Sequence, residues 1–182
     1  GRISYILDAG PCTIGVESTV VEVHDDKVII LRPGGITKAQ LEAVVSTVEY
    51  DTAIVNATTK PKAPGMKYTH YAPDAPMTVV VGSPERVAST FKELSEGIEG
   101  PIGCLVSHET YNLMKEDTRF IYHCFGHHGD ALALGHDFYK SLLYFNENHV
   151  TLILAEGVDD DGFGVAIMNR MEKASSHHII YK

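Results

Sequence analysis

Residues 77–182 alternate between short apolar runs and segments of helical spacing. The apolar runs "MTVVVG", "IGCLVS", "RFIYHCF" and "VTLILAEGV" are typical of buried strands. Helices are predicted in "SPERVASTFKELSEG", "HETYNLMK", "DALALGHDFYKSLLYFNENH" and "GFGVAIMNRMEKASS", the first with Ser83 as N-cap and Pro84 at its first position. Strands that alternate with helices form βαβ units. We therefore predict an α/β fold with a parallel sheet covered by helices on both faces.

The first 50 residues are β-rich and follow a different pattern. "SYILDAG" is a short strand-like run that ends in a turn, and "VESTVVEVH" alternates so that Val16, Ser18 and Val20 share one face. The turn signal "HDDK" leads to a second strand in "VIILRPGG", which predicts a hairpin. A helix follows in "ITKAQLEAVV", with Thr37 as its predicted N-cap.

Residues 51–76 lose this periodicity. The stretch "APGMKYTHYAPDAP" is broken by prolines and a glycine, so it favours neither a helix nor a central strand. A loop of this length is either functional or a linker. It nevertheless carries Lys67, Tyr68, His70 and Tyr71. The tyrosines should pack on something, so they either join two domains or cover a pocket.

Charge and cysteine content narrow the functional classes. The 182 residues carry a formal net charge of −9, which argues against a broad nucleic-acid interface but not against a small bound nucleotide. Cys12, Cys104 and Cys124 show no CxxC spacing, which predicts neither a disulfide framework nor a zinc site and favours a reducing cytoplasm. No apolar run has the length of a membrane span. The opening "GRISYILDAGP" indicates either a piece of a longer protein cut inside a domain or a processed terminus.

Two residues stand out as candidate ligand contacts. Ser18, among valines, is either a hydrogen-bonded core serine or a serine that lines a pocket. Arg32 precedes Pro33-Gly34-Gly35, where it either offers a donor fork to phosphate or carboxylate or is a surface arginine before a turn.

The remaining candidates are weaker. The pairs His127-His128 and His177-His178 make poor chelates, because adjacent side chains point different ways. A Ser18–His70–Asp51 triad is disfavoured, because no GxSxG-like elbow surrounds the serine. We therefore assign no catalytic residue and no metal ligand.

Four motifs in register point to a family. "DAGPCTIGVESTVVEV", "IILRPGGIT", "PGMKYTHYAP" and "GFGVAIMNRMEKA" together resemble the Sua5/YrdC/YwlC family of two-domain threonylcarbamoyl-AMP synthases, over essentially the whole chain. The resemblance implies that residues 1–50 are the C-terminal remnant of a YrdC-like α/β catalytic domain. It further implies that residues 51–76 are an interdomain linker or lid, and that residues 77–182 form a Rossmann-like Sua5 domain.

The resemblance also implies an activity. Family members make L-threonylcarbamoyl-AMP and pyrophosphate from L-threonine, bicarbonate and ATP, with Mg²⁺ expected beside the nucleotide. No bound cofactor is expected in the part of the protein that this chain represents. The product feeds the modification of adenosine 37 in tRNA by downstream threonylcarbamoyl-transferase proteins in the cytoplasm. Neither direct tRNA binding nor membrane binding is expected of this chain.

The motifs carry over to individual residues. Ser18 matches a serine of the substrate pocket, Arg32 and Tyr71 match residues that contact ATP, and Lys67 and His70 are possible lid contacts. The family's K-x-R-like and S-x-N-like motifs are absent from this sequence. We therefore expect this chain alone to be inactive. The alternative is a non-catalytic Rossmann-like module that regulates by binding a nucleotide or a protein.

Overall fold

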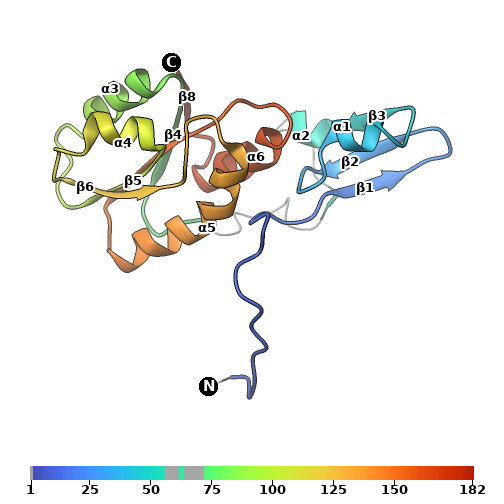
Figure 1. Ribbon diagram of the computed structural model, residues 1–182, viewed down its shortest axis with the longest axis horizontal. Helices are drawn as coiled ribbons and strands as arrows, with labels where there is room; N and C mark the ends of the chain where they lie inside the picture. The colour runs from blue at the N-terminus through green and yellow to red at the C-terminus, as the bar shows by residue number, and fades with distance from the viewer. Residues whose placement is uncertain (1, 56–61, 64–71) are drawn as a thin grey trace.

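The computed structural model of the chain describes residues 2–55, 62–63 and 72–182. Two separate sheets organise these residues. The larger sheet has five strands in the order β6-β5-β7-β4-β8, and the smaller has three in the order β1-β2-β3. Figure 1 shows the two sheets at opposite ends of the molecule, with the N-terminal segment extending away from both.

The five-stranded sheet is parallel throughout, as the alternation of strands and helices predicts. Four helices connect its strands, and Ser83 accepts a hydrogen bond from the Arg86 amide as the predicted N-cap of the first. The elements are β4 (Met77–Val81), α3 (Pro84–Leu94), β5 (Ile102–Val106), α4 (His108–Met114), β6 (Phe120–Cys124), α5 (Ala131–Glu147), β7 (Leu152–Glu156), α6 (Gly164–Ala174) and β8 (Ile179–Tyr181).

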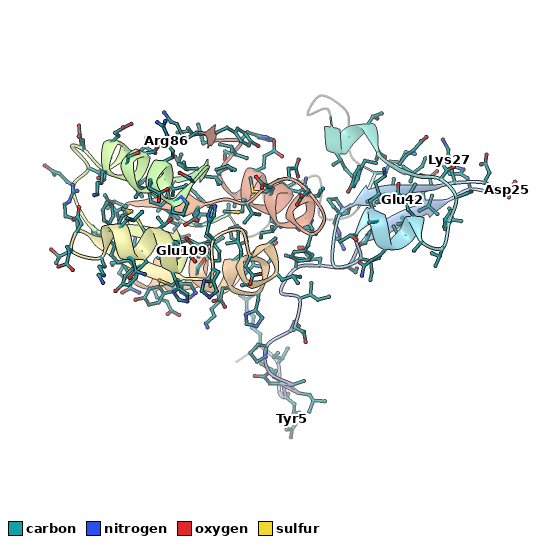
Figure 2. The ribbon with its side chains drawn as sticks, turned by 45° about the horizontal axis from the view of Figure 1, so that its top comes forward. Tyr5, Asp25, Lys27, Glu42, Arg86 and Glu109 are labelled. Atoms are coloured by element: carbon teal, nitrogen blue, oxygen red, sulfur yellow. The ribbon has the colours of Figure 1, made fainter. Side chains whose placement is uncertain are left out.

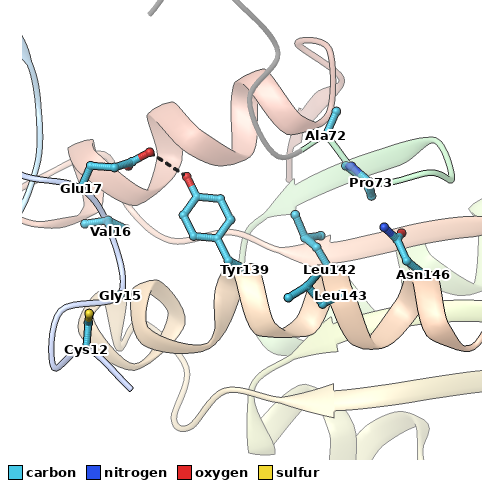
Figure 3. A pocket seen from close by; sticks show the side chains of 10 residues that line it. All are labelled: Cys12, Gly15, Val16, Glu17, Ala72, Pro73, Tyr139, Leu142, Leu143 and Asn146. Atoms are coloured by element: carbon cyan, nitrogen blue, oxygen red, sulfur yellow. Dashed lines mark hydrogen bonds between the residues drawn. The ribbon is translucent and has the colours of Figure 1, made fainter. Parts of the chain in front are cut away.

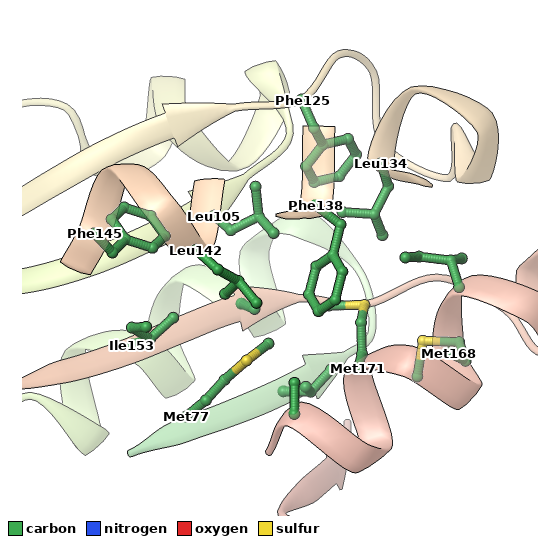
Figure 4. Packing of buried hydrophobic residues seen from close by; sticks show 14 of the residues in the cluster. Met77, Leu105, Phe125, Leu134, Phe138, Leu142, Phe145, Ile153, Met168 and Met171 are labelled. Atoms are coloured by element: carbon green, nitrogen blue, oxygen red, sulfur yellow. The ribbon is translucent and has the colours of Figure 1, made fainter. Parts of the chain in front are cut away.

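Successive residues of the central strands enter opposite cores. In β4, Val79 packs in the core under α5 and α6, whereas Val80 packs in the core under α3 and α4. Ile153 and Leu154 of β7 divide in the same way, because neighbouring side chains of a strand face opposite sides. Helices therefore cover both faces of the sheet, as predicted. Figure 4 shows the core under α5 and α6, where aromatic rings from α5 contact methionines from α6 and β4.

The smaller sheet contains the predicted hairpin. β1 (Val20–Val23) runs antiparallel to β2 (Val28–Arg32), and β3 (Val48–Tyr50) lies parallel to β2. Thr37 caps α1 (Lys38–Glu42) in a reciprocal capping box with Gln40, which confirms the predicted N-cap.

Two local expectations are corrected by the structure. The "SYILDAG" run forms no strand, and residues Tyr5 and Leu7 are 94% and 101% exposed. Among the described residues no strand lies beside this run to supply the ladder bonds that a strand requires; Figure 2 shows Tyr5 on the extended segment, away from both sheets. The one-turn helix α2 (Thr52–Val55) begins within the segment predicted to be irregular, because Asp51 Oδ1 accepts the Ala53 amide 2.8 Å away. No helix in the described parts of the chain has both the length and the hydropathy needed to cross a bilayer.

We expect Phe138→Ala to lower the free energy of unfolding by about 3–5 kcal/mol, because the ring is fully buried in the core under α5. Urea denaturation measures the effect. Leu132→Ala, on the same helix but with 59% of its surface exposed, is the control and should change stability by less than about 0.5 kcal/mol. Equal losses in the two variants would contradict this packing.

Candidate functional site

The structure brings Ser18 and Arg32 together. Arg32 is the last residue of β2 and pairs with Val20, the first residue of β1. Ser18 lies two residues before Val20 in the sequence. The Arg32 guanidinium donates to the Ser18 carbonyl oxygen from Nε at 3.2 Å and from Nη2 at 3.0 Å. Arg32 Nη2 also lies 3.5 Å from Ser18 Oγ. Two residues selected separately from the sequence are therefore direct neighbours, although their roles stay predictions.

Ser18 does not lie within a strand, in contrast to the expectation from the alternating pattern. β1 begins only at Val20. Side chains hold the backbone that precedes this strand. Arg32 donates a hydrogen bond to the Ser18 carbonyl oxygen. Thr19 Oγ1 donates to the Ile36 carbonyl oxygen at 2.6 Å and accepts from the Ile36 amide at 3.0 Å. These bonds replace ladder bonds, so the loop of Ser18 is fixed against the loop that follows Arg32.

Gly34 permits this close approach between the two loops. A Cβ atom at Gly34 would overlap with the Glu17 carbonyl oxygen, the Ser18 carbonyl carbon and the Thr19 nitrogen. All three are backbone atoms that cannot rotate away. The residue after Pro33 therefore has to be glycine for the loops to pack in this way.

Glu17 connects these loops to the helices of the larger sheet. Arg170 in α6 donates from Nε to Glu17 Oε2 at 2.9 Å, and its Nη2 lies 2.9 Å from the same oxygen in an ion pair without hydrogen-bond geometry. Arg170 Nη1 also donates to the carbonyl oxygens of Pro33 and, at 3.3 Å, Ala166. Tyr139 of α5 donates to Glu17 Oε1 at 3.5 Å (Figure 3).

Positive charge is concentrated at this junction. Arg32, Arg170 and Lys173 surround Glu17, in a chain whose net charge is −9. Burial alone would raise the pKa of the Glu17 carboxyl, but the charge and hydrogen bond of Arg170 and the charge of Arg32 outweigh it and lower that pKa. Burial, followed by repulsion from Arg170, lowers the pKa of Lys173 to about 8. Glu17 and Glu172 act in the opposite direction on Lys173, so acidic and basic groups both contribute to this junction.

A largely apolar cavity of about 470 Å³ lies beside Glu17. Val16 and Glu17 line it from the N-terminal segment, Tyr139 and Leu142 from α5, and Pro73 from the segment that leads into β4 (Figure 3). Gly15 allows the segment to approach α5, because a Cβ atom there would meet the Gly135 and His136 backbone. The cavity is formed where the N-terminal segment packs on the larger sheet's helices.

Three predicted contacts are not tested by this geometry. Lys67, His70 and Tyr71 lie outside the described residues, so their roles stay predictions. The Ser18–His70–Asp51 arrangement is likewise untested, although the Asp51 carboxylate caps α2.

The adjacent histidines contact different partners, as expected for neighbouring side chains. His127 Nδ1 lies 2.9 Å from Glu109 Oε1, and His128 Nδ1 lies 2.7 Å from the buried Glu156. The hydrogen bond from His127 is the main cause that lowers the pKa of Glu109 to about 2. The part of the chain that the structure describes contains no group of three or more metal-ligating side chains.

Sequence reasoning missed Glu17, Tyr139, Arg170 and Lys173. One signal for Arg170 was present: it lies at i+3 from Ile167 on the apolar face of "AIMNRMEKA". An arginine on a buried helix face needs a partner. That its partner lies 153 residues earlier could not be inferred from local pattern.

Comparison with known proteins shows which family this chain belongs to. A model of the threonylcarbamoyl-AMP synthase C-terminal domain family, Sua5_C, matches residues 36–176, which is most of the chain. The chain belongs to this family. It is 42% identical over 99% of its length to a Bacillus subtilis protein named threonylcarbamoyl-AMP synthase, and 35% identical over 99% to a Pyrococcus abyssi protein of the same name.

A solved structure agrees with the sequence relatives. The crystal structure of P. abyssi Sua5 complexed with L-threonine superposes with a TM-score of 0.79 at 33% identity over 100% of this chain. This family member nevertheless covers only 52% of that chain, and 51% and 52% of the B. subtilis and P. abyssi sequences. The chain therefore spans about half the length of the relatives it matches.

We expect Gly34→Ala to speed amide hydrogen exchange at Ile36, because the added methyl group pushes apart the loops that the Thr19–Ile36 bonds join. Exchange monitored by NMR measures this effect. Gly97→Ala is the control: Gly97 has φ +73° but nothing within 4 Å of a Cβ atom, so the same substitution there should leave Ile36 unchanged. Unchanged exchange at Ile36 in Gly34→Ala would rule out the close approach.

We expect Lys173→Met to flatten the rise of unfolding free energy between about pH 8 and pH 10.5. The folded pKa is about 8 and the unfolded value is 10.5, so the unfolded state binds more protons in this window and stability rises with pH. The penalty for the charge is fully present below pH 8 and is lost above 10.5. Urea denaturation across this range measures the slope.

The control for this prediction is Lys140→Met, which removes a lysine that is 71% exposed. It should leave the slope close to that of the wild-type chain. A slope in Lys173→Met equal to the wild-type slope would contradict the burial of Lys173 at a cationic junction.

Proposed function

We propose that this chain is the C-terminal part of an L-threonylcarbamoyl-AMP synthase. The complete protein would convert L-threonine, bicarbonate and ATP into threonylcarbamoyl-AMP and pyrophosphate, for modification of adenosine 37 in tRNA by downstream transferase proteins. Mg²⁺ would accompany ATP, and the cytoplasm would be the site of the reaction. The contact between Ser18 and Arg32 at a cationic junction, in a member of this family, is the observation that carries the proposal.

The proposal gives each part of the chain a role. Residues 1–50 would complete the wall of a YrdC-like catalytic domain, residues 51–76 would be the linker or lid, and residues 77–182 would be the Sua5 domain. Ser18 would contact the amino-acid or carbamate part of the substrate, and Arg32 would contact ATP. Tyr71 would cover the nucleotide, with Lys67 and His70 as further lid contacts.

The chemistry explains why positive donors are needed. The threonine amine and bicarbonate would form a carbamate with loss of water, and an oxygen of that carbamate group would attack the α-phosphorus of ATP as the bond to pyrophosphate breaks. Two anions must therefore approach each other, and fixed donors offset their repulsion. Arg32 Nε and Nη2 donate to the Ser18 carbonyl oxygen, and these two bonds would hold the guanidinium in place for such a role. L-threonine is bound in the P. abyssi Sua5 structure, which supports the same substrate here.

We expect Arg32→Met in the full-length protein to lower threonine-dependent pyrophosphate release by about 100-fold, the scale seen when one charge-stabilising donor is lost. Ser18→Ala should lower it by about tenfold, because one hydroxyl contact is removed. A coupled phosphate assay measures both. Arg119→Met is the control, since Arg119 forms an exposed ion pair with Asp117 away from the junction, and its rate should match the wild type.

The 182-residue chain alone should release no pyrophosphate above background in the same assay, because it lacks the K-x-R-like and S-x-N-like motifs. A wild-type rate in Arg32→Met, or activity of the chain alone, would contradict the proposal. If Arg32→Met keeps the wild-type rate, a non-catalytic nucleotide- or protein-binding module would describe this chain better.

A further inference from the structure

We propose that Arg170 is a positioning residue for the Ser18–Arg32 pair, so that helix α6 of the larger sheet sets the geometry of a site built on the smaller sheet. The inference rests on the proposed function of that pair. Arg170 contacts the residue before Ser18 and the residue after Arg32, namely Glu17 and Pro33. These bonds go to Glu17 and Pro33 and not to Ser18 or Arg32 themselves. Arg170 would therefore act on Ser18 and Arg32 through the backbone that links them to these neighbours.

The contacts form a closed ring of hydrogen bonds and peptide links. Arg170 Nε holds the Glu17 carboxylate, and the chain continues directly to Ser18. The Ser18 carbonyl oxygen accepts from Arg32, and the chain continues to Pro33, whose carbonyl oxygen accepts from Arg170 Nη1. A displacement of the Arg170 guanidinium therefore moves both loops of the pair at once.

The ring is rigid at the Arg170 corner. Arg170 is 7% exposed, and its own helix supplies another acceptor in the Ala166 carbonyl, 3.3 Å from Nη1. Tyr139 of α5 reaches the other Glu17 oxygen at 3.5 Å, so two helices fix this carboxylate. A buried guanidinium with directed acceptors has little freedom to change rotamer without leaving charges unpaired.

The planar fork of arginine is what this position requires. Its nitrogens reach a carboxylate on one loop and a carbonyl oxygen on the other from a single rigid group. A lysine keeps the charge and the attraction to Glu17 but cannot hold two acceptors in fixed directions. Arg170→Lys therefore separates the positioning role from a purely electrostatic one.

A residue that only stabilises the fold would behave differently from one that positions Arg32. A loss of folded enzyme lowers the number of active sites, whereas a displaced donor lowers kcat at each site. If Arg170 acts through Arg32, its substitution should have little further effect once Arg32 has been removed. An effect on kcat that does not act through Arg32 would instead multiply with the effect of the Arg32 substitution.

The test uses the full-length protein and threonine-dependent pyrophosphate release, normalised to the concentration of folded enzyme. We expect Arg170→Lys to lower kcat by about 10- to 100-fold with KM for ATP changed less than about threefold, since a displacement of about 1 Å can cost 100-fold in rate. In an Arg32→Met background, the same substitution should change kcat by less than about twofold. Arg119→Lys is the matched control and should retain the wild-type kcat.

Glu17→Gln provides a second variant if Arg170→Lys does not fold. It keeps the shape of the side chain, removes its charge and should lower kcat in the same direction. Wild-type kcat in both Arg170→Lys and Glu17→Gln, while Arg32→Met is impaired, would overturn the positioning role alone. Losses that multiply in the double variant would also overturn it. A wild-type rate in Arg32→Met would overturn the proposed function, and this inference with it.

Discussion

Arg170 carries a positive charge into a position that is 7% exposed, and the loops beside the smaller sheet contact helix α6 where that charge is neutralised. A buried guanidinium is costly unless an acid and further acceptors surround it. Glu17 supplies the acid and Pro33 a carbonyl oxygen, and both belong to loops that flank the smaller sheet. The packing of the N-terminal loops on α6 therefore follows from the electrostatic requirement of one side chain.

The loops can satisfy this requirement only because their backbones come very close together. Gly34 allows the turn after Pro33 to lie against the Glu17–Thr19 backbone, and Gly15 allows the preceding segment to lie against α5. The same approach places the Arg32 guanidinium on the Ser18 carbonyl. The candidate site and the packing of these loops on α6 are thus one arrangement, so a change in α6 should alter the position of Arg32.

Local sequence pattern predicted most of the elements but not their contacts. The parallel sheet, the hairpin and the Ser83 and Thr37 caps follow from periodicity and short-range signals, so they could be predicted. Ser18 was placed in a strand because alternation cannot reveal that Arg32 and Thr19 satisfy the backbone there instead. The Glu17–Arg170 pair spans 153 residues, and no local rule predicts such a partner.

The most direct test of this account is a double-mutant cycle on Glu17→Gln and Arg170→Met, read from amide hydrogen exchange at Ile36. The Ile36 amide donates a hydrogen bond to Thr19 Oγ1, so its exchange rate reports the free energy needed to separate the two loops. The account predicts that each single variant lowers the opening free energy and that the double variant costs little more than one of them. The coupling energy should be about 1–3 kcal/mol. Effects that add to within about 0.3 kcal/mol would contradict the claim that this ion pair joins the loops beside the smaller sheet to α6.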